Sequence, residues 1–237
     1  MQTRTKILIY LAVWKRPLIT ELCFRGIDRL KTHPAFDISA LAVISEESVI
    51  PLCEKYGVKW VMYKNEPLGE KKNFGLKEAK KMDFDYLMEI GSDDLVLNEL
   101  LDNYKNVIGK SEFFGISDAA YINSETGECR RLISRSTYGA GRMISKKALE
   151  LVGWNLWYDH LNRGMDNNSV SALNRKGVPY YRTAPMEFPG VIDVKSKENI
   201  WKFNYFLGVE YDKANILDKL SKPERELLES MYAESEG

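Results

Sequence analysis

The stretch Tyr86-Leu87-Met88-Glu89-Ile90-Gly91-Ser92-Asp93-Asp94 joins a short, mostly apolar run to an abrupt polar turn. Apolar runs of this length, bounded by turn residues, are typical of buried strands. Comparable runs precede it at 7–13, 38–44 and 58–63, and a segment with helical spacing of apolar residues or a turn and helix signal follows each one. Strands that alternate with helices predict an α/β fold: a doubly wound, mostly parallel sheet with helices on both faces.

The second half of the chain has a different pattern. Two apolar segments, 113–122 and 129–133, flank the turn-rich residues 123–128, which predicts a small antiparallel hairpin. The simplest organisation is one domain at 1–195 followed by a C-terminal helical extension at 196–237. The other elements expected are helices at 18–30, up to Gly57, up to Lys81, at 98–109, from Ser145 to Gly153, from a cap at Asp166 or Asn167 to Gly177, and at 219–232, with a strand at 178–183.

Composition limits the classes of protein. The 34 basic and 34 acidic side chains balance, which removes the general electrostatic reason to expect nucleic acid as a partner. An odd count of three cysteines without metal-ligand spacing favours reduced thiols and a cytoplasmic location. The apolar run at 7–14 is far shorter than the roughly 20 residues that cross a bilayer, so we expect no transmembrane segment.

The adjacent carboxylates Asp93 and Asp94 follow the fourth predicted strand directly. Ligands of doubly wound sheets bind at the carboxyl ends of the strands. Mg²⁺ and Mn²⁺ prefer oxygen ligands, and such an ion can neutralise the charge that builds on a departing diphosphate. The alternative is an Asp-rich turn that caps the next helix.

Two segments together resemble the donor half of GT-A fold glycosyltransferases of the family-two type: Lys72-Asn73-Phe74-Gly75-Leu76, and 85–94, which ends where that family has its DxD motif. The resemblance covers about the first 100 residues and continues more weakly to Thr183. It implies a donor half at about 1–110, an acceptor half at about 111–195, a nucleotide-sugar donor such as a UDP-sugar, and Mn²⁺ or Mg²⁺. Gly91 stands where the first Asp of the motif usually lies, and Asp93 matches the second.

The resemblance also implies a set of donor-binding residues. The loop after the first strand should border the nucleotide, and an acidic residue after the second strand should accept a hydrogen bond from base or ribose. A lysine and an asparagine at the start of the third helix should reach the phosphate or base, while Lys71 should point to solvent. The expected donor contacts are Val13, Trp14, Arg16, Glu46, Glu47, Lys72, Asn73, Ser92, Asp93 and Arg142, with Asp93 and Asp94 as the metal ligands.

Inverting transfer requires a general base that removes the proton of the acceptor hydroxyl. In the related family this base is an acidic residue before a helix in the second half, which implies Asp166, with Asp159 in reserve. An N-cap of the helix is the alternative for Asp166. Trp154 and Trp157 could stack on a sugar or lie in the core. Other residues considered near the donor or metal are His160, Asp193 and Lys195.

Two other functions remain open at the level of sequence. A nucleotidyltransferase would share the Asp-bound Mg²⁺, but the loop 13–17 lacks the glycines that this class carries after its first strand. A transferase-like protein without catalysis would bind a nucleotide or a glycan. The acceptor of an active enzyme could be a glycan, a lipid-linked sugar, a protein or a modified base, and the C-terminal segment could support an oligomer.

Overall fold

The computed structural model describes residues 4–133, 138–199, 202–205 and 208–233. Seven strands form the first sheet, in the order β10-β6-β9-β4-β1-β2-β3. β1 to β4 run parallel to their neighbours among themselves, while β9 runs antiparallel to both β4 and β6. These strands are β1 (Thr5–Val13), β2 (Phe36–Ile44), β3 (Lys59–Met62), β4 (Tyr86–Gly91), β6 (Phe113–Gly115), β9 (Arg142–Ser145) and β10 (Tyr181–Arg182).

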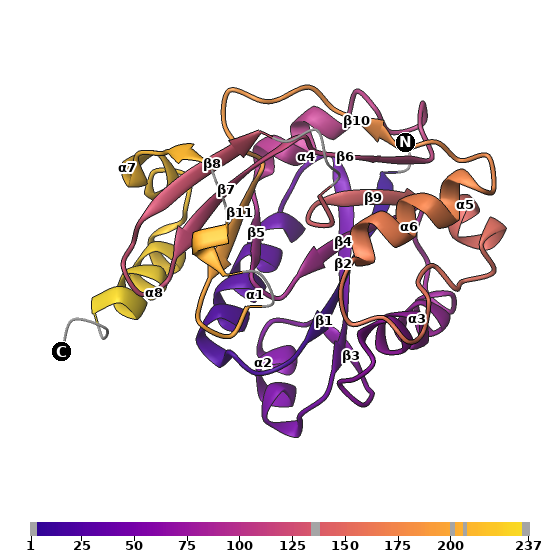
Figure 1. The fold of residues 1–237 in the computed structure, drawn as a ribbon, viewed down its shortest axis with the longest axis horizontal. Coiled ribbons are helices and arrows are strands. Elements are labelled where there is room, and N and C mark those ends of the chain that lie inside the picture. The colour runs from indigo at the N-terminus through magenta and orange to yellow at the C-terminus, as the bar shows by residue number, and fades with distance from the viewer. Residues whose placement is uncertain (1–3, 134–137, 200–201, 206–207, 234–237) are drawn as a thin grey trace.

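Helices cover both faces of this sheet because successive side chains of a strand point to opposite sides. Ile9 of β1 packs in one apolar cluster with Phe24 of α1, while its neighbour Leu8 packs in another with Leu76 of α3. α1 and α2 therefore lie on one face and α3, α5 and α6 on the other (Figure 1). The helices are α1 (Pro17–Lys31), α2 (Ile50–Lys55), α3 (Leu68–Ala79), α4 (Asn98–Tyr104), α5 (Lys146–Leu151) and α6 (Met165–Asn174).

A second sheet of five strands lies beside the first, in the order β12-β8-β7-β11-β5. The predicted hairpin is confirmed as β7 (Asp118–Asn123) and β8 (Cys129–Ile133), which pair antiparallel. The other strands of this sheet come from distant segments: β5 (Asp94–Val96), β11 (Val191–Lys195) and β12 (Val209–Glu210). The expected α/β class is confirmed, but the fold contains two mixed sheets instead of one sheet with an isolated hairpin.

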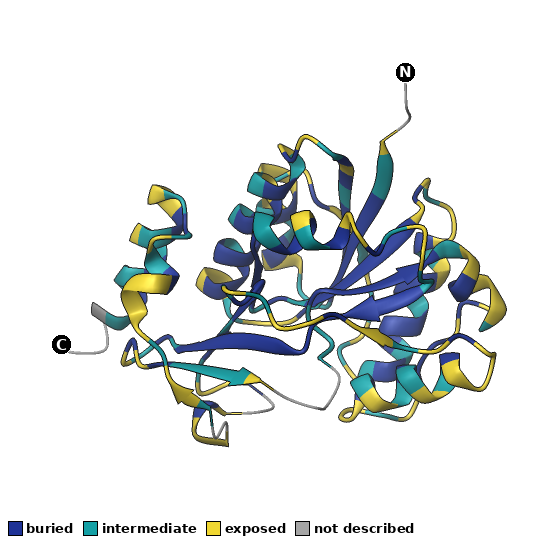
Figure 2. Ribbon diagram, turned by 90° about the horizontal axis from the view of Figure 1, so that it is seen from above, coloured by how far each residue is buried: buried dark blue, intermediate teal, exposed yellow. Residues whose placement is uncertain are grey.

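The described part of the C-terminal segment packs on the rest of the chain. β12 extends the second sheet, and α7 (Lys213–Leu217) and α8 (Lys222–Ala233) cover one of its faces through an apolar cluster shared with α1. Glu224 of α8 is fully buried and pairs with Arg29 of α1 at 3.0 Å. Figure 2 shows the central strands buried along most of their length and exposed residues at the periphery. The domain boundary at residue 195 stays a prediction.

Several predicted boundaries are wrong. The expected strand 113–122 is two strands, β6 and β7, that belong to different sheets, since a continuous apolar run does not reveal a bend between them. The expected strand 178–183 contains only two strand residues, and helix 98–109 ends at Tyr104. Ser145 caps α5 as expected, accepting a hydrogen bond from the Ala148 amide at 3.0 Å. No helix within the described ranges is both long and apolar enough to span a membrane.

Candidate metal and donor site

Three aspartates meet at the carboxyl end of β4. The strand ends at Gly91, a tight turn carries Asp93, and Asp94 begins β5. β11 runs antiparallel to β5 in a register that places Asp193 directly opposite Asp94. One carboxylate oxygen from each of Asp93, Asp94 and Asp193 lies within 4.8 Å of the others. We call these residues the acid cluster.

The acid cluster carries a surplus of negative charge. Two unit charges about 4 Å apart repel by roughly 4 kcal/mol at an effective dielectric constant near 20. Burial, together with Asp193 and Asp93, therefore raises the pKa of Asp94 far above its usual range. Burial and Asp93 likewise raise the pKa of Asp193 to about 6, although Lys195 opposes this shift. Burial also acts to raise the pKa of Asp93, but Arg16 and Lys195 outweigh it and lower that pKa.

Two cations and an amide border the acid cluster. Arg16 donates from Nη1 to Asp93 Oδ2 at 2.9 Å and from Nη2 to Ser92 Oγ at 3.1 Å. Lys195 Nζ lies 2.6 Å from Asp193 Oδ2. Asn199 donates its side-chain amide to Asp93 Oδ2 as well. Three carboxylates thus share two cations.

The donor set fits a divalent cation. Asp193 Oδ1 is buried and has no hydrogen-bond partner among the described residues, and an unpaired buried carboxylate oxygen is costly. Carboxylate oxygens are the ligands that Mg²⁺ and Mn²⁺ prefer. A Cβ at Gly91 would lie 2.4 Å from Asp93 Oδ1, so a side chain there would displace this carboxylate, whereas Asp193 supplies a carboxylate from another strand. Asp93, Asp94 and Asp193 are the residues that would hold the ion.

The loop after β1 reaches the acid cluster through an unusual backbone. Lys15 and Arg16 have φ values of 55° and 54°, and consecutive non-glycine residues in the left-handed region cost roughly 1–2 kcal/mol each. The Lys15 amide donates to Glu46 Oε2 at 3.2 Å. Trp14 is 39% exposed next to them, while Glu47 is exposed at the start of a short 3₁₀ helix (Glu47–Val49). Arg16, Trp14 and Glu46 are therefore near the expected donor position, at the ends of β1 and β2.

The expectation that Lys71 points to solvent is wrong. Its side chain is buried beneath this loop, and Nζ donates to the carbonyl oxygen of Val13 at 2.7 Å and to Asn65 Oδ1 at 3.3 Å. Burial lowers the pKa of Lys71 to about 8, although Glu46 acts in the opposite direction. Val13 is itself buried, so its contribution at the site is a carbonyl oxygen that Lys71 already uses.

A second group of charges lies inside the fold. Glu89 on β4 is directly opposite Arg142 on β9, and Arg142 Nη2 donates to Glu89 Oε2 at 2.8 Å. Lys72 of α3 pairs with the other oxygen of Glu89. Arg142 also donates to Asp166 Oδ1 and to its carbonyl oxygen, both at 3.1 Å. We call Lys72, Glu89, Arg142 and Asp166 the ion chain.

Three expected donor contacts have polar partners within the protein. Arg142 is fully buried and Lys72 nearly so, and both pair with Glu89. Asn73 donates to Asp159 Oδ1 and to the Trp157 carbonyl, and it accepts from the Leu156 and Trp157 amides. Those four bonds use the full capacity of its amide. These residues support the fold around the site, which sequence spacing alone does not reveal.

The remaining candidates of the second half divide between core and surface. Trp154 and Trp157 are buried, so the core alternative applies to both. His160 is exposed and stacks on Tyr158 with ring centroids 5.9 Å apart, outside the acid cluster. The predicted cap at Asp166 is wrong: α6 begins at Met165 after Gly164, whose φ is 73°, and Asp166 lies in the first turn.

The acid cluster and Asp166 are linked by the segment 138–142. Tyr138 shares a side-chain hydrogen bond with Tyr121, and burial together with nearby Asp118 and Asp193 raises the pKa of Tyr138 to about 12. At the next residue, a Cβ on Gly139 would lie 2.4 Å from Asp166 Oδ1. Two adjacent residues of this segment, Tyr138 and Gly139, therefore lie near Asp193 and Asp166, respectively.

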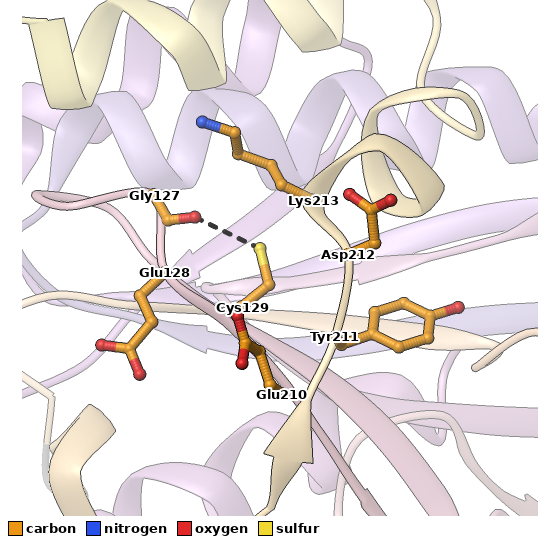
Figure 3. A pocket seen from close by; sticks show the side chains of 7 residues that line it. All are labelled: Gly127, Glu128, Cys129, Glu210, Tyr211, Asp212 and Lys213. Atoms are coloured by element: carbon orange, nitrogen blue, oxygen red, sulfur yellow. Dashed lines mark hydrogen bonds between the residues drawn. The ribbon is translucent and has the colours of Figure 1, made fainter.

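A cavity of about 500 Å³ opens elsewhere, between the β7–β8 turn and the start of α7 (Figure 3). Its lining includes the thiol of Cys129, which donates to the Gly127 carbonyl at 3.4 Å. Burial raises the pKa of Cys129 to about 12, so the nucleophilic thiolate is scarce at neutral pH. None of the three aspartates of the acid cluster lines this cavity.

Comparison with known proteins gives no family. The chain matches no protein-family model and no curated protein sequence. What the site can do follows from its residues: bind a divalent cation through three carboxylates and an anion beside Arg16 and Lys195.

Proposed function

We propose that the protein is a metal-assisted glycosyltransferase that uses a nucleotide-diphosphate sugar, with the diphosphate bound at the acid cluster. The observation that carries this proposal is the meeting of Asp93, Asp94 and Asp193 at the carboxyl end of β4, with a buried, unpaired oxygen on Asp193. Bound Mg²⁺ or Mn²⁺ supplies charge neutralisation for a departing diphosphate. A finer assignment to the GT-A fold belongs to the same proposal.

The groups around the acid cluster suit the parts of such a donor. Arg16 presents a planar guanidinium, which matches phosphate oxygens in two-point contacts, and Lys195 adds a second positive charge. Glu46 and the exposed face of Trp14 lie at the ends of β1 and β2, where a carboxylate can accept from a ribose or base. A uridine nucleotide is the donor that the sequence resemblance favours.

Asp166 is the general base of the proposed reaction. Its carboxylate is about half exposed, at 46%, and can meet an acceptor hydroxyl. The acceptor oxygen forms a bond to the anomeric carbon while the bond from that carbon to the diphosphate oxygen breaks, and the hydroxyl proton moves to Asp166. Attack from the face opposite the leaving group inverts the anomeric centre. The acceptor is a compound whose hydroxyl can approach the exposed side of Asp166. The three free cysteines suit a cytoplasmic location of the enzyme.

One observation favours a second function, a nucleotide-binding protein without turnover. Asp93 Oδ2 already accepts hydrogen bonds from both Arg16 and Asn199, so the cluster is partly closed by the protein's own groups. In that case a nucleotide sugar would bind without being cleaved.

The test measures thermal stability and donor hydrolysis with a panel of nucleotide sugars, with and without Mn²⁺. A ligand at a hundredfold excess over Kd stabilises by about 2.7 kcal/mol, which corresponds to roughly 5–10 °C in Tm for a chain of this size. We expect one nucleotide family to shift the native protein in the presence of Mn²⁺ and Asp193→Asn to show no shift. Asp28→Asn, an exposed carboxylate on α1 with 61% exposure, is the matched control.

The outcomes separate the two functions. Metal-dependent binding with release of free sugar supports the transferase, while binding without release supports the second function. Absence of any shift in the native protein across the panel contradicts both.

A further inference from the structure

We infer that Glu89 and Arg142 are positioning residues that fix the carboxylate of Asp166 in the orientation used for proton transfer. This inference rests on the proposed function, because it concerns the base of that reaction. It assigns a task to the buried members of the ion chain, which are not part of the acid cluster.

Asp166 is the exposed member of the ion chain, and the other three members are buried. Glu89 is 2% exposed, Arg142 is 0% exposed and Lys72 is 8% exposed. Asp166, at 46%, is the member that meets solvent. Arg142, which is held in the centre of the sheet, therefore orients the accessible carboxylate of Asp166.

Glu89 and Arg142 are each fixed by several contacts. Glu89 lies between Tyr10 on β1 and Arg142 on β9 in the sheet register, and each of its oxygens has a cationic partner. Arg142 then holds Asp166 at two points, its Oδ1 and its carbonyl oxygen. Two-point contacts restrict orientation as well as distance, so the side chain and the first turn of α6 are held together.

The backbone at position 139 leaves space for the Asp166 carboxylate. An alanine at this position would bring its Cβ within 2.4 Å of Asp166 Oδ1, so the carboxylate would have to shift. Gly139 thus permits the orientation in which Asp166 accepts hydrogen bonds from Arg142.

The buried ion pairs of the ion chain carry a desolvation cost. Buried ion pairs are seldom worth more than apolar residues of the same volume, because desolvation offsets their attraction. The ion chain also leaves Arg142 Nε buried without a hydrogen-bond partner in the described structure, a further cost. Stability alone does not account for this arrangement, whereas a base that must be held within about 0.5 Å of its working geometry does.

The experiment uses the charge-balanced variant Lys72→Met/Glu89→Gln, which removes one buried cation and one buried anion together and leaves Arg142 with Asp166. We expect a cooperative unfolding transition and unchanged donor Kd and stoichiometry by calorimetry. We expect kcat for metal-dependent donor hydrolysis to fall about 10- to 100-fold, since a misplacement of about 1 Å costs that much, with KM changed less than about twofold. The matched control is Lys147→Met/Glu112→Gln, a surface pair at 3.4 Å, which should keep the native kcat.

The outcomes distinguish this inference from the proposed function. If the native protein binds no nucleotide sugar, the proposed function fails first. If the native protein turns over, Asp166→Asn is inactive and the Lys72→Met/Glu89→Gln variant keeps its kcat, the inference is overturned and the proposed function stands. If that double variant does not fold, Arg142→Lys decides the matter: it keeps the charge beside Glu89 but loses the planar fork, and a native kcat in this variant overturns the inference.

Discussion

Two pairs of charged residues face each other across neighbouring strands: one pair has opposite charges and the other has like charges. Glu89 faces Arg142 across β4 and β9, and Asp94 faces Asp193 across β5 and β11. Opposite charges in such positions stabilise a sheet, whereas like charges destabilise it. The ion chain is balanced, with two acids and two cations, and the acid cluster has three acids for two cations. The surplus of negative charge, not burial itself, distinguishes the acid cluster from the ion chain and is the reason that we propose a cation there.

The largest effect is expected where the balanced pair is broken. Glu89→Ala leaves Lys72 and Arg142 buried without their shared carboxylate, and removal of one partner of a buried pair costs about 3–5 kcal/mol. We expect the free energy of unfolding in urea to fall by that amount. The same substitution in the acid cluster, Asp193→Ala, should cost much less without metal, because it also removes repulsion. Equal losses at the two sites would erase the distinction drawn between them.

A buried cation outside both groups sharpens the comparison. Lys71 has two neutral oxygens as hydrogen-bond partners, and its pKa is lowered from 10.5 to about 8. Between these values the unfolded chain binds more protons than the folded one, so this group makes stability rise with pH. We expect native protein to gain about 3 kcal/mol relative to Lys71→Met as pH rises from 8 to 10.5. Urea denaturation of both proteins across that range measures it, and a constant difference would contradict the burial of a strained cation.

Stability at the acid cluster should change with pH in the opposite direction and in an acidic window, because burial favours the neutral form of both Lys71 and Asp193, and Asp193 is neutral when protonated. The pKa of Asp193 is raised from 3.8 to about 6. The folded state therefore binds more protons between these values, and the contribution of Asp193 to stability is lost as pH rises through about 6. Asp193→Asn should not show this loss. At pH 7, Mn²⁺ at a hundredfold excess over Kd should restore about 2.7 kcal/mol to the native protein and nothing to the variant, as measured by urea denaturation with and without the ion.

The first half of the fold could be predicted from the sequence because its elements are local. Each of β1, β2 and β4 contains a mostly apolar run, and the helices between them have clear apolar faces. Apart from the β7–β8 hairpin, the second sheet could not be predicted in this way. β5 and β12 have three and two residues, too short for a periodic signal, and they pair with strands far away in the chain.

The candidate site divides along the same line. Asp93 and Asp94 were predicted as metal ligands because they directly follow a recognisable strand. Asp193 was considered near the donor, but its position opposite Asp94 follows only from the β5–β11 register. Lys72 and Arg142 were expected at the donor because of the family resemblance, which does not reveal that both pair with Glu89 inside β4. Glu89 is a charged residue in the middle of the apolar segment 86–91, and that exception was the available signal for a buried counter-cation.

The smallest expected effect concerns the strained loop that joins β1 to the acid cluster. Lys15 and Arg16 share left-handed backbone geometry, which glycine adopts without steric cost. Lys15→Gly removes strain and an exposed side chain, so we expect about 1 kcal/mol of added stability. Arg16→Gly relieves the same strain but loses the contacts to Asp93 and Ser92, so its stability should rise less, and phosphate binding should weaken. Urea denaturation and inorganic phosphate titration compare the two variants. If Arg16→Gly matched Lys15→Gly in both measurements, the guanidinium would contribute neither to the acid cluster nor to anion binding, and the strain in this loop would have no functional counterpart.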